Sequence, residues 1–189
     1  MLYLTKYESI LGELTLVSDE ENLVGLWIEG QKHFMGKLAG MDVVELDLIE
    51  ADEDSNIAET FQMRENVLKA RNILECVKTW LEQYFTGENP NPKELPLAPK
   101  GSEFQELVWR YLCEIPYGEV ITYGELARKV AVQMGKQHMS AQAIGGAVGR
   151  NPISIIIPCH RVVGADGSLT GYAGGVEKKR MLLELEGSI

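Results

Sequence analysis

The sequence of 189 residues contains no apolar run near the roughly 20 residues that a membrane-spanning helix needs. Residues 1–6 lack the basic region that precedes the hydrophobic stretch of a secretory signal. Cysteine is also scarce: Cys76, Cys113 and Cys159 are odd in number and far apart, which argues against a disulfide framework. These absences exclude membrane-spanning and disulfide-stapled classes, and we expect a cytoplasmic protein in a reducing compartment.

Acidic residues are missing from one part of an otherwise acidic chain. Residues 1–97 hold 8 Lys/Arg and 19 Asp/Glu, a net charge of −11, whereas residues 98–189 hold 10 and 9, a net charge of +1. The stretch 126–165 has no Asp or Glu but includes Arg128, Lys129, Lys136, Arg150 and Arg161. An acid-free basic segment is what a phosphate-contacting face needs. Chance spacing of surface charge is the alternative.

Alternating apolar residues over 2–28, interrupted by turn residues, predict an antiparallel meander. A further strand is expected at 43–48, followed by a solvated acidic run at 50–54. Helical spacing predicts a helix over 64–85, with Cys76 in or near the core. The Asn-Pro-Asn-Pro sequence at 89–92 ends this helix and opens a linker. We therefore predict two domains, 1–97 and 98–189.

The second domain has the pattern of short capped helices over 102–114, 123–132 and 141–149, with Ser102, Thr122 and Ser140 as N-caps. The last two helices form a plausible helix-turn-helix. The second of them is rich in small residues, which suit close approach to a nucleic-acid groove or to another helix, and both interpretations stay open.

An apolar run at 153–157, interpreted as a strand, leads directly into Pro158-Cys159-His160-Arg161. A cysteine is nucleophilic as the thiolate, and a neighbouring imidazole or a hydrogen-bonded chain to a carboxylate favours that form. The alternative is a small buried cysteine that fills the core.

These motifs together resemble the O6-alkylguanine-DNA alkyltransferases, also called methylated-DNA–protein-cysteine methyltransferases. The resemblance is dense over 104–187 and looser over the first ninety residues. The segments that carry it are 117–123, 145–148, Asn151-Pro152, 157–162 and 171–175. It implies an α/β (α+β) fold, in which a ribonuclease-H-like N-terminal domain with an antiparallel sheet gives structural support. A mainly helical winged-helix/helix-turn-helix DNA-binding domain follows and carries the active-site cysteine.

The resemblance implies DNA repair by irreversible transfer of an alkyl group from guanine O6, and by extension from O4-alkylthymine, to Cys159. By similarity, His160, a water and Glu186 activate the thiol, Asn151 holds the loop, and Tyr123 protonates or polarises guanine N3. The alkylated base would be held by Val162, Tyr172 and Ala173, in a pocket that also includes Val148 and Ser154. Ser154 stands where some relatives carry proline, which suggests a roomier pocket.

The same resemblance places a helix in the minor groove of a duplex from which the damaged base has left the stack. The chain departs from the family pattern here, because Gln142 stands where the family has an intercalating arginine. We expect Gln142 to keep that role with weaker electrostatics. The other residues expected to contact DNA are Ser140, Ala141, Ala143, Gly145, Arg150 and Arg161.

The partner implied is double-stranded DNA containing alkylated guanine, with no membrane, no obligate protein partner and a monomeric state. A thioether lacks a good leaving group, so each molecule should act once and need no cofactor. We predict no structural zinc, since residues 1–97 hold Cys76 and His33 as their single cysteine and histidine. Three alternative functions are a lesion-binding protein without transferase activity, a cysteine hydrolase and an architectural DNA-binding module. Lesion-binding proteins of this fold lack the nucleophilic cysteine.

Overall fold

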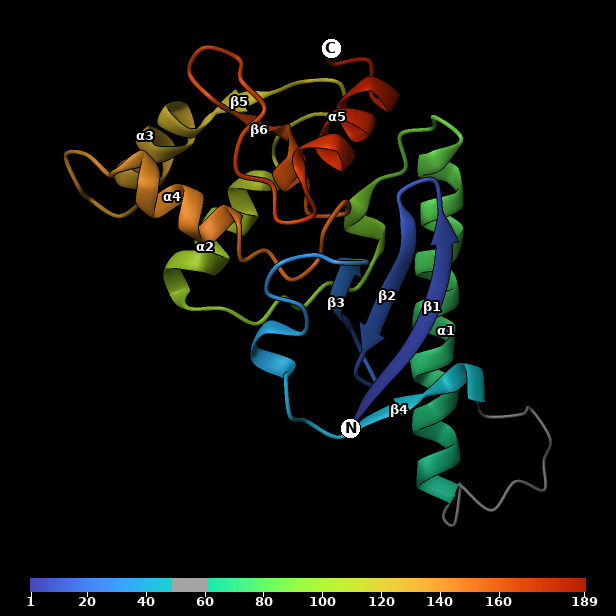
Figure 1. Cartoon of the computed structure of the whole chain (residues 1–189). Coiled ribbons are helices and arrows are strands. Elements are labelled where there is room, and N and C mark those ends of the chain that lie inside the picture. Colours follow the sequence, from blue (N-terminus) through green and yellow to red (C-terminus); the bar gives the residue numbers. More distant parts are fainter. Residues whose placement is uncertain (49–60) are drawn as a thin grey trace.

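The computed structural model describes residues 1–48 and 61–189, so the acidic run at 50–54 lies outside the described residues. The sheet and a long helix form one side of the molecule, and a group of shorter helices lies beside the sheet (Figure 1). No helix in the described ranges combines the length and apolar character that crossing a bilayer requires.

The N-terminal sheet begins with the expected meander. Strands β1 (Leu2–Ser9), β2 (Gly12–Ser18) and β3 (Leu23–Ile28) pair antiparallel, and β4 (Val43–Glu45) adds to β1 in parallel, giving the order β3-β2-β1-β4. The strand expected at 43–48 stops early and continues as a short 3-10 helix, Leu46–Leu48. The Asp47 carboxylate accepts hydrogen bonds from the Thr5 hydroxyl and the Lys6 N–H, so a side chain replaces the next rung of the ladder.

Helix α1 (Phe61–Phe85) packs against β1 and β2. Its buried stripe comprises Ala70, Leu74, Val77, Trp80, Leu81 and Tyr84. The expectation that Cys76 lies in or near the core is wrong, because Cys76 falls outside this stripe and is exposed. The last turn of α1 instead carries Tyr84 toward the second half of the chain.

The helices of the second half begin where their caps predict. Helices α2 (Glu103–Leu112), α3 (Tyr123–Gln133) and α4 (Ala141–Val148) start after Ser102, Thr122 and Ser140, and each cap side chain accepts a hydrogen bond from an N–H in the first turn. All three helices pack against one another. Two short parallel strands, β5 (Ile121–Thr122) and β6 (Val162–Val163), precede the last helix, α5 (Val176–Leu185).

The apolar run 153–157 is a buried turn, so the predicted strand is wrong. Only Ile153 pairs in strand fashion, in an isolated parallel bridge with Leu26 at the edge of β3. Ile155 then adopts a φ of 71°, and the Ile157 N–H donates to the Ile153 carbonyl. All four isoleucines of the run are at most 2% exposed. The run is apolar because it is buried on every side. A short apolar run of this kind cannot be told from a buried strand by its sequence alone.

Candidate active site

Cys159 begins the short 3-10 helix Cys159–Arg161, directly after the buried turn, and is 5% exposed. The Asn151 side-chain amide holds both the turn and the thiol. Its Nδ2 donates to the Ile157 carbonyl at 2.8 Å and to Cys159 Sγ at 3.2 Å, while its Oδ1 accepts from the Ile153 N–H at 3.0 Å. Asn151 therefore fixes the sulfur in place and offers it a hydrogen-bond donor.

Two opposing effects act on the Cys159 thiol. Burial raises its pKa, and the Asn151 amide and the Lys179 ammonium lower it in part. Lys179, on α5, is fully buried, and its Nζ donates to the Val162 carbonyl at 2.5 Å and the Thr170 carbonyl at 3.0 Å. Burial lowers the pKa of Lys179 to about 8. The resting sulfur is thus a thiol surrounded by groups that favour its ionisation.

The Glu186 carboxylate, just beyond α5, is the centre of a buried hydrogen-bonded network. Its Oε1 lies 2.8 Å from His160 Nε2 and accepts from Arg161 Nη2 at 2.8 Å and from the Tyr84 hydroxyl at 2.6 Å. Its Oε2 accepts from Arg161 Nε at 2.8 Å. The side chains of His160 and Glu186 have no exposed surface. Burial alone would raise the pKa of Glu186, but hydrogen bonds from His160 and Arg161 lower it to about 2.

The charge on Glu186 decides the tautomer of His160. Burial lowers the pKa of His160, so the imidazole is neutral, and an anionic carboxylate requires the proton on Nε2. His160 Nδ1 is therefore an acceptor, and it is buried without a hydrogen-bond partner among residues 1–48 and 61–189. A base of this kind accepts a proton at Nδ1, while Glu186 stabilises the resulting imidazolium.

Tyr123, the first residue of α3, lies near this site and is half-buried. Its hydroxyl donates to the Thr170 carbonyl at 3.2 Å, the same oxygen that Lys179 contacts. A Cβ at Gly171, where φ is +70°, would come within 2.9 Å of the Tyr123 hydroxyl, so this position requires glycine. The Tyr123 hydroxyl is placed as a donor at the loop 170–175.

Most of the remaining predicted pocket residues are buried. Val148, Ser154, Val162 and Tyr172 are buried, and Ala173 is half-buried. The Ser154 hydroxyl donates to Gln31 Oε1 at 3.0 Å, and the Ala173 carbonyl accepts from the Lys32 N–H at 3.0 Å. Gln31, Lys32 and Tyr84 all come from the N-terminal half, and the sequence gives no signal for them beyond the core periodicity of α1 at Tyr84.

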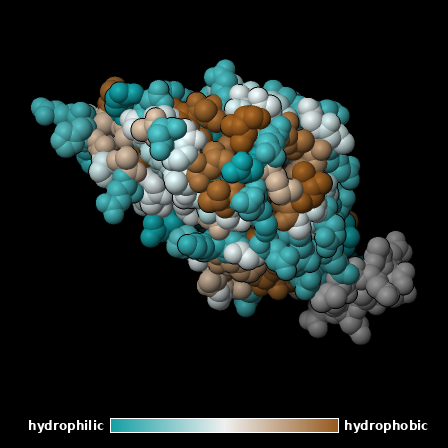
Figure 2. All heavy atoms as spheres, turned by 45° about the horizontal axis from the view of Figure 1, so that its top comes forward, coloured by the Kyte–Doolittle hydropathy of each residue, from teal (hydrophilic) through white to brown (hydrophobic). Residues whose placement is uncertain are grey.

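The first turn of α4 is exposed at Ala141, Gln142 and Ala143, whereas Ile144, Ala147 and Val148 are buried. Gly145 faces the Tyr123 ring, since a Cβ there would lie 3.8 Å from it. The small residues of α4 thus serve helix packing on one face and leave the other face open. Hydrophilic side chains form the tip of the end of the molecule where the connection between α3 and α4 lies, with more apolar side chains beside them (Figure 2).

Two sequence profiles match almost all of the chain. The profile described as "6-O-methylguanine DNA methyltransferase, ribonuclease-like domain" matches residues 2–99, and "6-O-methylguanine DNA methyltransferase, DNA binding domain" matches residues 103–188. The chain belongs to the 6-O-methylguanine DNA methyltransferase family. It is 49% identical over 114 residues to a methylated-DNA--protein-cysteine methyltransferase of Haemophilus influenzae, an alignment that covers 60% of this chain and 61% of the relative, less than two thirds of its length.

Other members of the methyltransferase family match over a larger share of their length. A methylated-DNA--protein-cysteine methyltransferase of Methanosarcina acetivorans is 45% identical over 136 residues, which cover 65% of this chain and 83% of the relative. The crystal structure of Mycobacterium tuberculosis OGT in complex with DNA superposes with a TM-score of 0.73 at 33% identity, covering 98% of this chain and 93% of that one. The expected family and the α/β (α+β) fold class are confirmed.

Arg161, one of the residues predicted to contact DNA, is buried in the structure. Arg161 is 7% exposed, and its guanidinium is bound by Glu186 and, through Nη1, by the Ile115 carbonyl at 2.7 Å. It is therefore a buried partner of Glu186, and the expectation that it contacts phosphate is wrong. Sequence spacing alone does not separate a buried arginine from an exposed one. The other basic residues of the acid-free stretch are exposed: Arg128, Lys129, Lys136 and Arg150.

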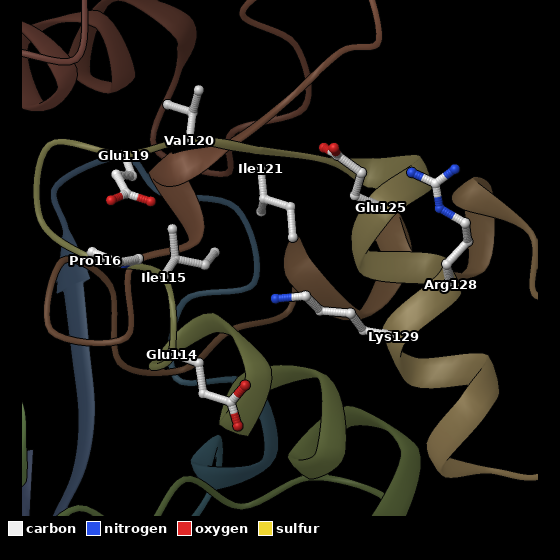
Figure 3. A pocket seen from close by; sticks show the side chains of 9 residues that line it. All are labelled: Glu114, Ile115, Pro116, Glu119, Val120, Ile121, Glu125, Arg128 and Lys129. Atoms are coloured by element: carbon white, nitrogen blue, oxygen red, sulfur yellow. The ribbon is translucent and has the colours of Figure 1, made fainter.

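A cavity of about 360 Å³ lies beside α3 (Figure 3), and Cys159 is not among the residues that line it. Its lining mixes the carboxylates of Glu114, Glu119 and Glu125 with Arg128 and Lys129, so it favours neither sign of charge. The Glu125 carboxylate is also occupied, because it accepts from the backbone and hydroxyl of the α3 cap. Within residues 1–48 and 61–189, no group of three or more His, Cys, Asp or Glu side chains is arranged to hold a metal ion.

Proposed function

We propose that this protein repairs DNA by transferring a methyl or other alkyl group from guanine O6 to Sγ of Cys159, once per molecule. The observation that carries the proposal is a buried thiol held by Asn151, preceding a His160–Glu186 pair whose Nδ1 is free to accept a proton. In the transfer the S–C bond forms as the C–O6 bond breaks, and the bonding electron pair moves to the guanine. A proton equivalent to the one lost from sulfur reaches the guanine, so the products are a thioether and a neutral base.

Each residue has a defined part in this step. His160 accepts the thiol proton at Nδ1 through a bridging water, and Glu186 stabilises the imidazolium that forms. Tyr123 donates to guanine N3 after its hydroxyl leaves the Thr170 carbonyl. Val162, Tyr172 and Ala173 hold the base, with Val148 and Ser154 behind them. Asn151 keeps the sulfur aligned for in-line attack, because its amide is tied to the turn on both sides.

The base reaches Cys159 only after leaving the duplex, because an intact stack does not present O6 to a thiolate in line. The exposed first turn of α4 enters the minor groove, and Gln142 fills the space of the extruded base. Ser140, Ala141 and Ala143 lie against the backbone of the duplex, and Gly145 acts with them by letting Tyr123 pack closely behind the inserted turn. Arg150 contacts phosphate together with the exposed basic residues of α3. The proposed insertion is polar and uncharged, where the family's pattern has an arginine.

The protein acts as a cytoplasmic monomer on double-stranded DNA, and O4-alkylthymine is a second substrate. The three cysteines, all free of disulfides, support this location, because the reaction consumes a free thiol and a reducing compartment preserves one. The lesion-binding alternative lacks support from the site, since Cys159 is present. A cysteine hydrolase would need N–H donors free to bind an oxyanion beside the sulfur. Here Asn151 Nδ2 already donates to the Ile157 carbonyl and to Sγ, and the Cys159 N–H donates to the Ile157 carbonyl.

The test is to incubate the protein with a duplex bearing O6-methylguanine and determine its mass. We expect one increment of a single methylene per molecule, with no increment in Cys159→Ala and an unchanged increment in Cys76→Ala, which removes an exposed thiol. Repeated turnover, or intact protein with no adduct, would contradict the proposal.

A further inference from the structure

The N-terminal half contributes a side chain to the buried network at Glu186. Tyr84, in the last turn of α1, is 1% exposed, and its hydroxyl donates to Glu186 Oε1 at 2.6 Å and lies 3.5 Å from His160 Nε2. Burial and the neighbouring Glu186 charge raise the pKa of Tyr84, so the hydroxyl remains a donor. The resemblance assigned this half a supporting role alone, which leaves the contact unexplained.

We propose that Tyr84 is a positioning residue of the alkyl transfer, whose hydroxyl holds the Glu186 carboxylate against His160 and takes up part of the charge on Oε1. The inference rests on the alkyl transfer proposed above. Tyr84 touches neither base nor sulfur, and it acts through the carboxylate.

The ring that carries this hydroxyl is itself fixed. Trp80 stacks on Tyr84 with ring centroids 5.4 Å apart and an interplanar angle of 9°, and Tyr117 meets it edge-on at 6.1 Å. Rigid packing of this kind fixes the position of the hydroxyl oxygen beside Glu186 Oε1, which accepts its hydrogen bond. The Glu186 carboxylate is therefore oriented from two sides, by Arg161 of the second half and by Tyr84 of the first.

Removal of the hydroxyl would change the chemistry of the pair. Oε1 accepts from Tyr84, His160 and Arg161, and each donor withdraws part of its charge. With Tyr84 absent, Oε1 becomes a stronger acceptor for the imidazole proton, so His160 is more easily protonated. The base that must accept the thiol proton is then already protonated over a wider range of acidic pH.

Other charges around His160 stay the same in this comparison. The groups that act on it are Glu186, Arg161 and Lys179, and the remaining titratable side chains near Glu186 and Cys159 are Tyr117, Tyr123 and Tyr172. None is altered by exchanging Tyr84 for phenylalanine, so a change in the pH profile reports the loss of one hydroxyl.

The experiment measures the single-turnover rate of alkyl transfer against pH for the full-length wild type and Tyr84→Phe. We expect the acidic limb of the Tyr84→Phe profile to move to higher pH by about half a unit or more, and the rate near neutral pH to fall roughly tenfold. The loss should be equal on a free O6-alkylguanine base and on a duplex, with unchanged DNA affinity. Replacing Tyr84 by a fluorinated tyrosine, a stronger donor, should move the limb the other way.

Tyr117→Phe is the matched control. It removes a hydroxyl from the same aromatic cluster, but that hydroxyl donates to the Leu185 carbonyl and not to Glu186. We expect it to keep the wild-type profile. A Tyr84→Phe profile that superposes on the wild type, or a fluorinated variant that shifts nothing, overturns the positioning role while leaving the alkyl transfer intact. A wild type that transfers no alkyl group would instead refute the proposed function.

Discussion

Arg161→Met is predicted to destabilise the protein strongly and to leave the DNA-binding surface unchanged. Methionine retains much of the apolar stem but removes the charge and the hydrogen bonds of the guanidinium to Glu186 and to the Ile115 carbonyl. The Glu186 side chain has no exposed surface, so the variant leaves a buried carboxylate without its cation. Removing one partner of a buried ion pair costs about 3–5 kcal/mol in the free energy of unfolding.

The pKa of Glu186 reflects its hydrogen bonds with both His160 and Arg161. Its folded-state pKa of about 2 lies below its usual value of 4.5, so ionised Glu186 contributes stability above pH 4.5. That contribution, about 3 kcal/mol in total, is lost as pH falls from 4.5 toward 2. We therefore expect Arg161→Met to lose about 3 kcal/mol or more of unfolding free energy at neutral pH. The gap to wild type should narrow below pH 4.5, where wild-type Glu186 loses its own contribution.

The assay is denaturation by urea at neutral pH and near pH 3, followed by tryptophan fluorescence, with DNA affinity measured alongside at several salt concentrations. Arg150→Met is the matched control, since Arg150 is exposed and its Nη1 contacts only the Gly146 carbonyl among the described residues. We expect Arg150→Met to change the unfolding free energy by less than about 0.5 kcal/mol. It should also reduce the slope of log binding constant against log salt concentration by about one. An Arg161→Met protein as stable as wild type, with weakened DNA binding, would refute the buried-pair reasoning.

Two further predictions concern Gln142 and Lys179. If Gln142 fills the space of the extruded base, Gln142→Ala slows repair of a duplex much more than reaction with a free alkylguanine base, and equal losses in single-turnover assays would contradict insertion. Lys179 has a folded-state pKa of about 8 against a usual 10.5, so the unfolded chain binds more protons between these values and stability should rise with pH there. Denaturation curves of Lys179→Met recorded at about pH 8 and pH 10 should lack that rise in unfolding free energy. If the variant keeps the wild-type rise, another titrating group causes it.

The parts of the fold that depend on local chemistry are predictable from sequence. The caps Ser102, Thr122 and Ser140 each fix a helix start through a hydrogen bond within four residues, and the meander follows from alternation and turns. The run 153–157 is different, since its turn depends on the Asn151 side chain and on pairing of Ile153 with Leu26, which lies far upstream. Composition at one site contains no information about such a partner.

The candidate site shows the same division. The family resemblance names Asn151, Cys159, His160 and Glu186 as one site, and the structure brings Asn151 to Cys159 and His160 to Glu186, while their roles in catalysis stay predictions. Arg161 was misassigned because charge counted along the chain does not reveal burial. Tyr84 was missed because an aromatic residue at helical spacing is in most cases a core residue, and only the assembled structure shows that its hydroxyl reaches Glu186 across 102 positions of sequence.

The contacts that cross between the halves bear on how such proteins are recombined. Tyr84 binds Glu186, Gln31 binds Ser154, and the Lys32 N–H binds the Ala173 carbonyl. A chimera that joins residues 98–189 to the N-terminal half of a relative would retain Cys159 while exchanging the side chains at positions 31 and 84. Its reactivity would therefore be a joint property of both parents, and the halves of this chain form one unit of exchange even though two separate sequence profiles describe them.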